Sequence, residues 1–181
     1  MRSRAREVRE KKQTQRLLRA FEAARARISA GQLAADQLPA LLAASDSEQR
    51  LLGLVAMRVL IEQGQPPSAY LDLAEPLIAD ADSTCRWQAC IVVSEAISSS
   101  PDSVWEAILA HSNGPDGDLQ AALACVLLEE LLQHDFDAYF PRLKREVWAG
   151  RSSLQGILRM CWLDLSGRQR SQLDRFLERG R

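Results

Sequence analysis

The 181-residue chain has few glycines and prolines, no long apolar run and no closely spaced cysteine pair. Nine glycines, seven prolines and few β-branched residues argue against a fold of many short strands and tight turns. Leucine and alanine, which favour helices, dominate instead. The longest apolar run, 121–128, has eight residues, whereas a membrane span needs roughly 20. No stretch near the start has the pattern of a signal peptide. We therefore expect an all-α, soluble protein.

Metal-binding and catalytic motifs are also lacking. The four cysteines lie inside apolar segments, at positions 85, 90, 125 and 161, and neither they nor the two histidines have zinc-ligand spacing. Buried free thiols favour a reducing compartment, so we expect a cytoplasmic protein without metal or cofactor. The chain contains no phosphate-binding glycine loop, G-x-S-x-G or H-E-x-x-H sequence. The sequence predicts a protein that is not an enzyme.

Charge is distributed unevenly, although the formal net charge is only −1. Residues 1–27 carry ten basic side chains against three acidic ones. Residues 28–166 carry eight basic against nineteen acidic groups, and residues 167–181 carry five arginines against two acids. An acidic body with basic ends bears on association with partners rather than on the fold.

The strongest pattern is a repeat. Four stretches align without gaps on anchor residues spaced by 36, 34 and 35 positions: Arg50, Arg86, Gln120 and Gln155. A shorter apolar segment precedes each stretch, and Asp, Ser or Gly residues stand where its helix would begin. Each unit is therefore predicted to be two antiparallel helices joined by a short polar turn. Small residues such as Gly53 are expected where the paired helices pass close together.

The first two units carry the order Pro-x-Leu-Leu or a close variant, then Asp-x-x-x-Arg, then an apolar helix. This order resembles HEAT repeats, which are relatives of armadillo repeats. The resemblance covers residues 33–166 and implies a right-handed α-solenoid of about four helical pairs. It also implies that Asp46, Arg50, Asp82 and Arg86 form a structural ladder between neighbouring repeats. The third unit lacks the arginine, and the fourth lacks both charged residues.

Three segments follow from these patterns: a basic N-terminal helix in 1–30, a repeat domain in 31–166 and a basic C-terminal helix or tail in 167–181. Apolar spacing predicts helices over 5–30 and 171–179, the second with a capping sequence at Ser171. The basic N-terminal helix has three open interpretations. It caps the first repeat, contacts nucleic acid, or pairs with the acidic body of its own or another chain.

The second helix of each pair offers candidate binding residues. If these helices line a concave face, one side of each helix is buried and the opposite side faces a partner. The side predicted to be buried includes Arg159, Cys161 and Trp162 in the fourth unit. The residues predicted on the opposite side are Gln88, Glu95, Glu129, Gln133 and Asp164, with Trp87 near its edge. A solvent-facing surface without a partner is the alternative. Trp105 and Trp162 are expected in the core.

These residues predict a scaffold that binds a basic protein segment on an acidic face. The alternative is a nucleic-acid-binding HEAT-like protein that uses its basic termini, with or without DNA glycosylase activity. The acidic face argues against the glycosylase, because acidic side chains repel phosphate. The bias towards arginine over lysine and towards alanine favours a GC-rich, bacterial genome. Oligomeric state and partner identity do not follow from the sequence.

Overall fold

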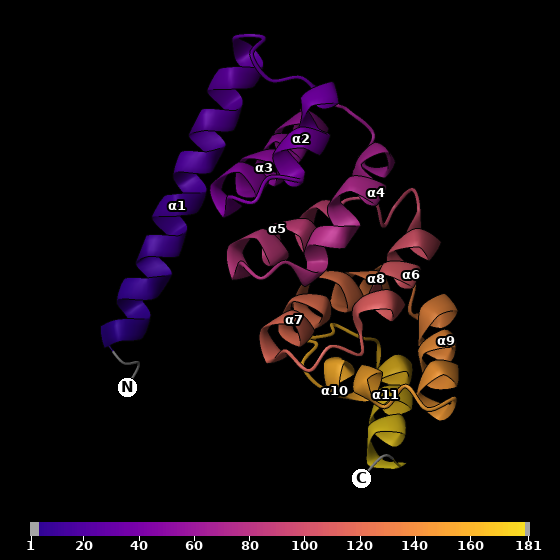
Figure 1. The fold of residues 1–181 in the computed structure, drawn as a ribbon. Coiled ribbons are helices and arrows are strands. Elements are labelled where there is room, and N and C mark those ends of the chain that lie inside the picture. The colour runs from indigo at the N-terminus through magenta and orange to yellow at the C-terminus, as the bar shows by residue number, and fades with distance from the viewer. Residues whose placement is uncertain (1–3, 180–181) are drawn as a thin grey trace. The chain divides into compact units, whose positions relative to one another are not determined.

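The computed structural model describes residues 4–179, and every regular element in that range is helical (Figure 1). The all-α prediction is therefore confirmed. The chain divides into two compact units, Met1–Val92 and Val93–Arg181, here called the N-terminal and C-terminal units. This division falls inside the predicted repeat domain, and each basic end belongs to a unit. The two units are described separately.

The N-terminal unit contains one long helix and two helical pairs. The long helix α1 spans Arg4–Ser29, close to the predicted range, and packs against α3. The bounds of the other elements are η1 Ala35–Gln37, α2 Leu38–Leu42, α3 Ser47–Glu62, η2 Pro67–Tyr70, α4 Leu71–Ala74, η3 Glu75–Ala79 and α5 Ser83–Ser94. The α2 and α3 helices pack against each other, and the α4–η3 segment and α5 occupy the chain positions of the second predicted pair.

Gly53 lies at the closest approach of α2 and α3. A Cβ atom added there would lie 2.9 Å from a methyl carbon of Leu42 and 3.2 Å from the Cβ of Leu41. The missing side chain lets the two helices pack closely, as the sequence predicts for this position. Leu51, Leu54 and Met57 are fully buried on α3, and they form part of the core of this unit.

The basic helix α1 is held on the N-terminal unit by ion pairs. The Arg16 guanidinium donates to Glu48 Oε1 at 2.6 Å and to both carboxylate oxygens of Asp82, at 2.8 and 3.0 Å. Arg25 donates to Glu62 at 3.1 Å. The Phe21 ring lies 4.9 Å from the Arg58 guanidinium carbon. Of the three interpretations of this helix, docking on the acidic residues of its own unit agrees with these contacts.

The acid that pairs with Arg50 is Asp80, a residue that the predicted ladder does not include. Arg50 donates to the two carboxylate oxygens of Asp80 at 2.6 and 3.0 Å. Asp46 instead caps α3 by accepting the Glu48 N–H, and Asp82 caps α5 by accepting the Cys85 N–H. Arg86 is buried and donates to the backbone carbonyl of Asp80. Neither Asp46 nor Asp82 pairs with Arg50, because both carboxylates are engaged at helix starts.

The C-terminal unit contains two helical pairs and a final helix. Its elements are α6 Pro101–His111, α7 Gly117–Ala122, η4 Leu123–Leu128, α8 Glu129–His134, α9 Phe136–Trp148, α10 Ser153–Leu158 and α11 Gly167–Arg179. The η4 segment is π-helical, so α7, η4 and α8 form one continuous helix with a wider turn in its middle. That helix is the second member of the third predicted pair.

The final helix is longer than predicted and packs on α9. It begins at Gly167 because Ser166 and Gln169 form a capping box: the Gln169 side chain accepts the Ser166 N–H, and the Ser166 hydroxyl accepts the Gln169 N–H. Ser171 instead donates to the Gly167 carbonyl inside the helix. Phe176 of α11 contacts the Phe140 ring edge-on, with 5.7 Å between ring centroids. Leu173 and Phe176 are buried, so α11 contributes to the core of this unit.

The cysteines are less uniform than the sequence predicts. Cys85 and Cys90 are buried, Cys161 is half-buried and Cys125 is exposed. Burial, with the nearby Asp82 and Asp80 carboxylates, raises the pKa of Cys85 to about 12. Burial also raises the pKa of Cys161. These thiols stay protonated at neutral pH, so they are poor nucleophiles.

Candidate functional site

In the C-terminal unit, the carboxylate of Glu130 lies within electrostatic reach of those of Glu95 and Glu129. Glu130, the second residue of α8, is repelled by Glu95 and by Glu129. Loss of solvation and this repulsion together raise the pKa of Glu130, although a hydrogen bond from Ser94 lowers it. Glu95 and Glu130 are exposed, and Glu129 is half-buried. None of the three forms an ion pair with any residue among 10–178, the part of the chain whose side chains the structure describes.

Trp162 lies beside this group, and its backbone is held from both sides. The Trp162 N–H donates to Glu129 Oε2 at 2.6 Å, and the Gln133 amide donates to the Trp162 carbonyl at 3.4 Å. The indole itself is 86% exposed. Two residues further along the same non-helical segment, Asp164 is exposed. We call Glu95, Glu129, Glu130, Gln133, Trp162 and Asp164 the acidic surface.

Two of the predicted site residues do not belong to this surface. Gln88 is buried in the N-terminal unit, where its side-chain oxygen accepts a 2.8 Å hydrogen bond from Arg58. The prediction that Gln88 faces a partner is therefore wrong, because its amide is used inside the fold. Leu52, Ala122 and Ile157, which lie two positions after their anchor residues as Gln88 does, are buried as well. Trp87 is half-buried in the N-terminal unit.

A projection onto regular helices does not predict Trp162 and Glu130 as site residues, because the helices around them are irregular. Trp162 is predicted in the core only if the second helix of the fourth pair continues past it. That helix, α10, ends at Leu158, and residues 161–166 are not helical. The wider π-helical turn of η4 rotates the residues that follow it, which changes the direction of Glu129 and Glu130. Trp105 is in the core, as predicted, whereas Trp162 and Arg159 are exposed.

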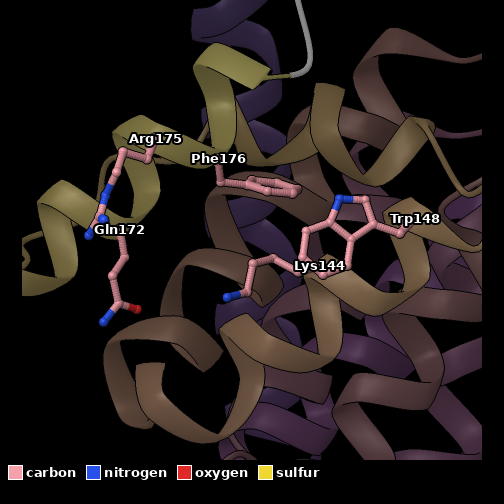
Figure 2. A pocket seen from close by; sticks show the side chains of 5 residues that line it. All are labelled: Lys144, Trp148, Gln172, Arg175 and Phe176. Carbon is pink, nitrogen blue, oxygen red and sulfur yellow. The ribbon is translucent and has the colours of Figure 1, made fainter.

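A separate hollow lies between α9 and α11. It has a volume of about 230 Å³ and is lined by Lys144, Trp148, Gln172, Arg175 and Phe176. Figure 2 shows the nitrogen ends of Lys144, Gln172 and Arg175 towards one side, and the rings of Phe176 and Trp148 towards the other. We call this hollow the basic pocket. The sequence showed the basic residues of this end, but it did not show that Trp148 and Phe176 meet.

A larger hollow of about 670 Å³ lies in the N-terminal unit. Its lining comes from α1 and α3 and includes Lys12, Arg16, Arg19 and Glu48. Arg16 and Glu48 already pair with each other there. This hollow therefore marks the docking of α1, and its charged groups are partly used by the fold.

No family model, curated protein or solved structure matches the chain. None of the helices within 4–179 has the length and apolar character to cross a bilayer. Among the side chains that the structure describes, no three His, Cys, Asp or Glu residues are grouped as a metal site. The function is therefore argued from the acidic surface and the basic pocket.

Replacing Glu130 by Gln is expected to stabilise the protein at neutral pH. The folded pKa of Glu130 is raised, so the folded state loses stability as the pH rises from the unfolded-chain pKa through the folded pKa. Gln keeps an acceptor for the Ser94 hydroxyl and removes the repulsion between carboxylates. The expected gain in the free energy of unfolding is less than about 1 kcal/mol, because the position is exposed. Urea midpoints should show a gain at pH 7.5 that disappears at pH 4. An equal gain at both pH values would contradict a raised pKa of Glu130 as its cause. The control is Glu106→Gln, which makes the same change at an exposed glutamate.

Proposed function

We propose that the C-terminal unit is a non-catalytic interaction module that binds a basic protein segment on the acidic surface. The observation that carries this proposal is the exposed Trp162, with its backbone held in place, beside carboxylates that have no cationic partner among residues 10–178. An arginine or lysine side chain placed there would supply the missing counter-charge. The Glu130 carboxylate, which repulsion from Glu95 and Glu129 disfavours, would become more favourable beside such a cation.

Trp162 supports a protein ligand in particular. Exposed tryptophans with a rigid backbone act as contact anchors, because they bury a large area at small entropic cost. The face of an indole also attracts a guanidinium or ammonium group, with about 0.5–2 kcal/mol gained as the cation loses water. Glu129 and Gln133 keep the Trp162 backbone in place, so only the side-chain torsions of the indole remain to be ordered on binding.

The proposed architecture behind this function is a right-handed α-solenoid of HEAT-like repeats. Its support is the regular spacing of the repeat and the helical pairs found within each unit. Gly53 at the crossing of α2 and α3 fits such pairing, and so does the use of Arg50 to join one helical pair to the next through Asp80. The proposal does not include catalysis, and a cytoplasmic location remains the expectation from the cysteines.

Fluorescein-labelled octa-arginine tests the proposal by fluorescence anisotropy at 50 mM NaCl. We expect the Glu95→Lys/Asp164→Lys double variant to bind about tenfold more weakly, because two exposed acids become repulsive. Trp162→Ala should weaken binding roughly 2- to 30-fold through loss of the cation–π contact.

The matched control is Glu106→Lys/Asp137→Lys, which makes the same charge change at exposed acids on α6 and α9. Its affinity should stay within about threefold of the wild type, since long-range charge effects are screened. Equal losses in the two double variants would show attraction by net charge alone, and would contradict a site at the acidic surface.

A further inference from the structure

The basic pocket combines cations that have no acidic partner with an exposed aromatic ring. Trp148 is 68% exposed, although a tryptophan is usually largely covered. Neither Lys144 nor Arg175 forms an ion pair with any described residue. The Lys144 ammonium instead lies 5.0 Å from the centroid of the Phe140 ring, and the Arg175 Nε donates to the Ser171 carbonyl. The charge of this pocket is therefore available to a ligand.

The basic pocket has an aromatic side and a polar side. Phe176 forms its buried wall and contacts Trp148 edge-on, with 6.3 Å between ring centroids. The polar ends of Lys144, Gln172 and Arg175 lie on the other side in Figure 2. A complementary ligand carries a planar apolar group next to an anionic group. A volume of about 230 Å³ suits one such unit rather than a large molecule.

The positive charge continues along α11 outside the pocket. Arg168, Gln172 and Arg175 follow one another at spacings of four and three residues, so they share one face of the helix. Arg168 and Arg175 are exposed. Seven residues of helix rise about 10 Å, so these cations can contact more than one anionic group of an extended ligand.

From these features we infer that the basic pocket binds single-stranded nucleic acid. One base stacks on Trp148 at the mouth of the pocket, its phosphate lies near Lys144 and Arg175, and a neighbouring phosphate lies near Arg168. Stacking on an aromatic side chain combined with a basic track is how proteins bind single strands without reading their sequence. An acidic peptide would satisfy the cations, but its carboxylates offer no aromatic ring to stack on Trp148.

This site is separate from the acidic surface and requires a ligand of opposite charge. It also differs from nucleic-acid binding through the N-terminal helix, where Arg16 and Arg25 are already paired with acids. The two proposals can therefore fail independently.

The test uses the full chain and a fluorescein-labelled oligothymidine of twelve nucleotides, measured by anisotropy at 50 mM NaCl. We expect Trp148→Ala to weaken binding roughly 5- to 100-fold, the loss of one stacked base. Its matched control is Trp162→Ala, which removes another exposed indole and should bind the oligonucleotide like the wild type.

A second pair of variants tests the charges. Arg168→Glu/Arg175→Glu should weaken binding by at least roughly tenfold and lower the salt dependence by about two phosphate contacts. Lys11→Glu/Lys12→Glu makes the same charge change at exposed residues of α1 and should have a small effect. Thermal melting and circular dichroism confirm that each variant is folded.

The following outcomes would overturn the inference. The wild type could fail to bind the oligonucleotide, or Trp148→Ala could bind as well as Trp162→Ala. Octaglutamate could displace the oligonucleotide with equal potency, which would identify an acidic-peptide site. Thymidine monophosphate could compete as well as the twelve-nucleotide strand, which would identify a site for free nucleotides. Preference for a duplex of the same length would exclude stacking on Trp148.

Discussion

Replacing Asp80 by Ala is expected to lower the free energy of unfolding of the N-terminal unit by about 3 kcal/mol. The Asp80 side chain is 4% exposed and binds the Arg50 guanidinium through both oxygens. It also accepts the Asp82 N–H at 2.8 Å, ahead of α5. Its removal leaves the Arg50 charge, 16% exposed, with only the carbonyls of Ala44 and Ser45. Loss of one partner of a buried pair costs more than the pair contributes, because the other charge stays desolvated.

Urea unfolding followed by hydrogen exchange with mass spectrometry measures this loss. The midpoint should fall, and amides in 47–94 should exchange faster than in the wild type. Asp72→Ala is the matched control, because Asp72 is exposed on α4, and its effect should stay within about 0.5 kcal/mol. A loss below about 1 kcal/mol for Asp80→Ala would show that water replaces the carboxylate around Arg50.

The helical repeat could be predicted from the sequence because it depends on local rules. Periodic apolar residues and Asp residues at helix starts predict the first residues of α3 and α7 within one or two positions, and Asp46 and Asp116 do cap them. The absence of a side chain at Gly53 predicts a close helix crossing, and α2 and α3 do approach closely there. These features need only the neighbours along the chain or one partner helix.

The candidate site could be predicted only in part. Straight helices predict Glu95, Glu129, Gln133 and Asp164 as site residues, whereas the acidic surface also includes Trp162 and Glu130. The π-helical turn in η4 and the early end of α10 depend on tertiary packing, which a helical projection does not contain. The burial of Gln88 also involves a long-range contact, because its partner Arg58 lies 30 positions away. The ion pair between Arg50 and Asp80 likewise joins residues 30 positions apart.

The basic pocket depends on one buried ring, Phe140, and replacing it by Ala is expected to have the largest effect in the C-terminal unit. Phe140 is 1% exposed, stacks on Phe136 with centroids 4.5 Å apart and contacts Phe176 edge-on. Truncation of a buried phenylalanine costs about 3–5 kcal/mol, through lost transfer energy, a cavity and lost ring contacts. Phe140→Leu keeps most of the volume and should cost about 1–2 kcal/mol.

The same substitution separates the two proposed sites. Phe140 supports Phe176 from α11 and Lys144 from α9, so Phe140→Ala should loosen α11 and weaken oligonucleotide binding. Hydrogen exchange should increase over 167–179 before the rest of the unit unfolds, because α11 also loses its main aromatic contact with α9. The acidic surface draws its residues from α8 and the segments around 95 and 161–166, so octa-arginine binding should change much less while the unit stays folded. Equal losses for both ligands at a temperature well below the melting point would mean that α11 and the acidic surface unfold as one cooperative unit.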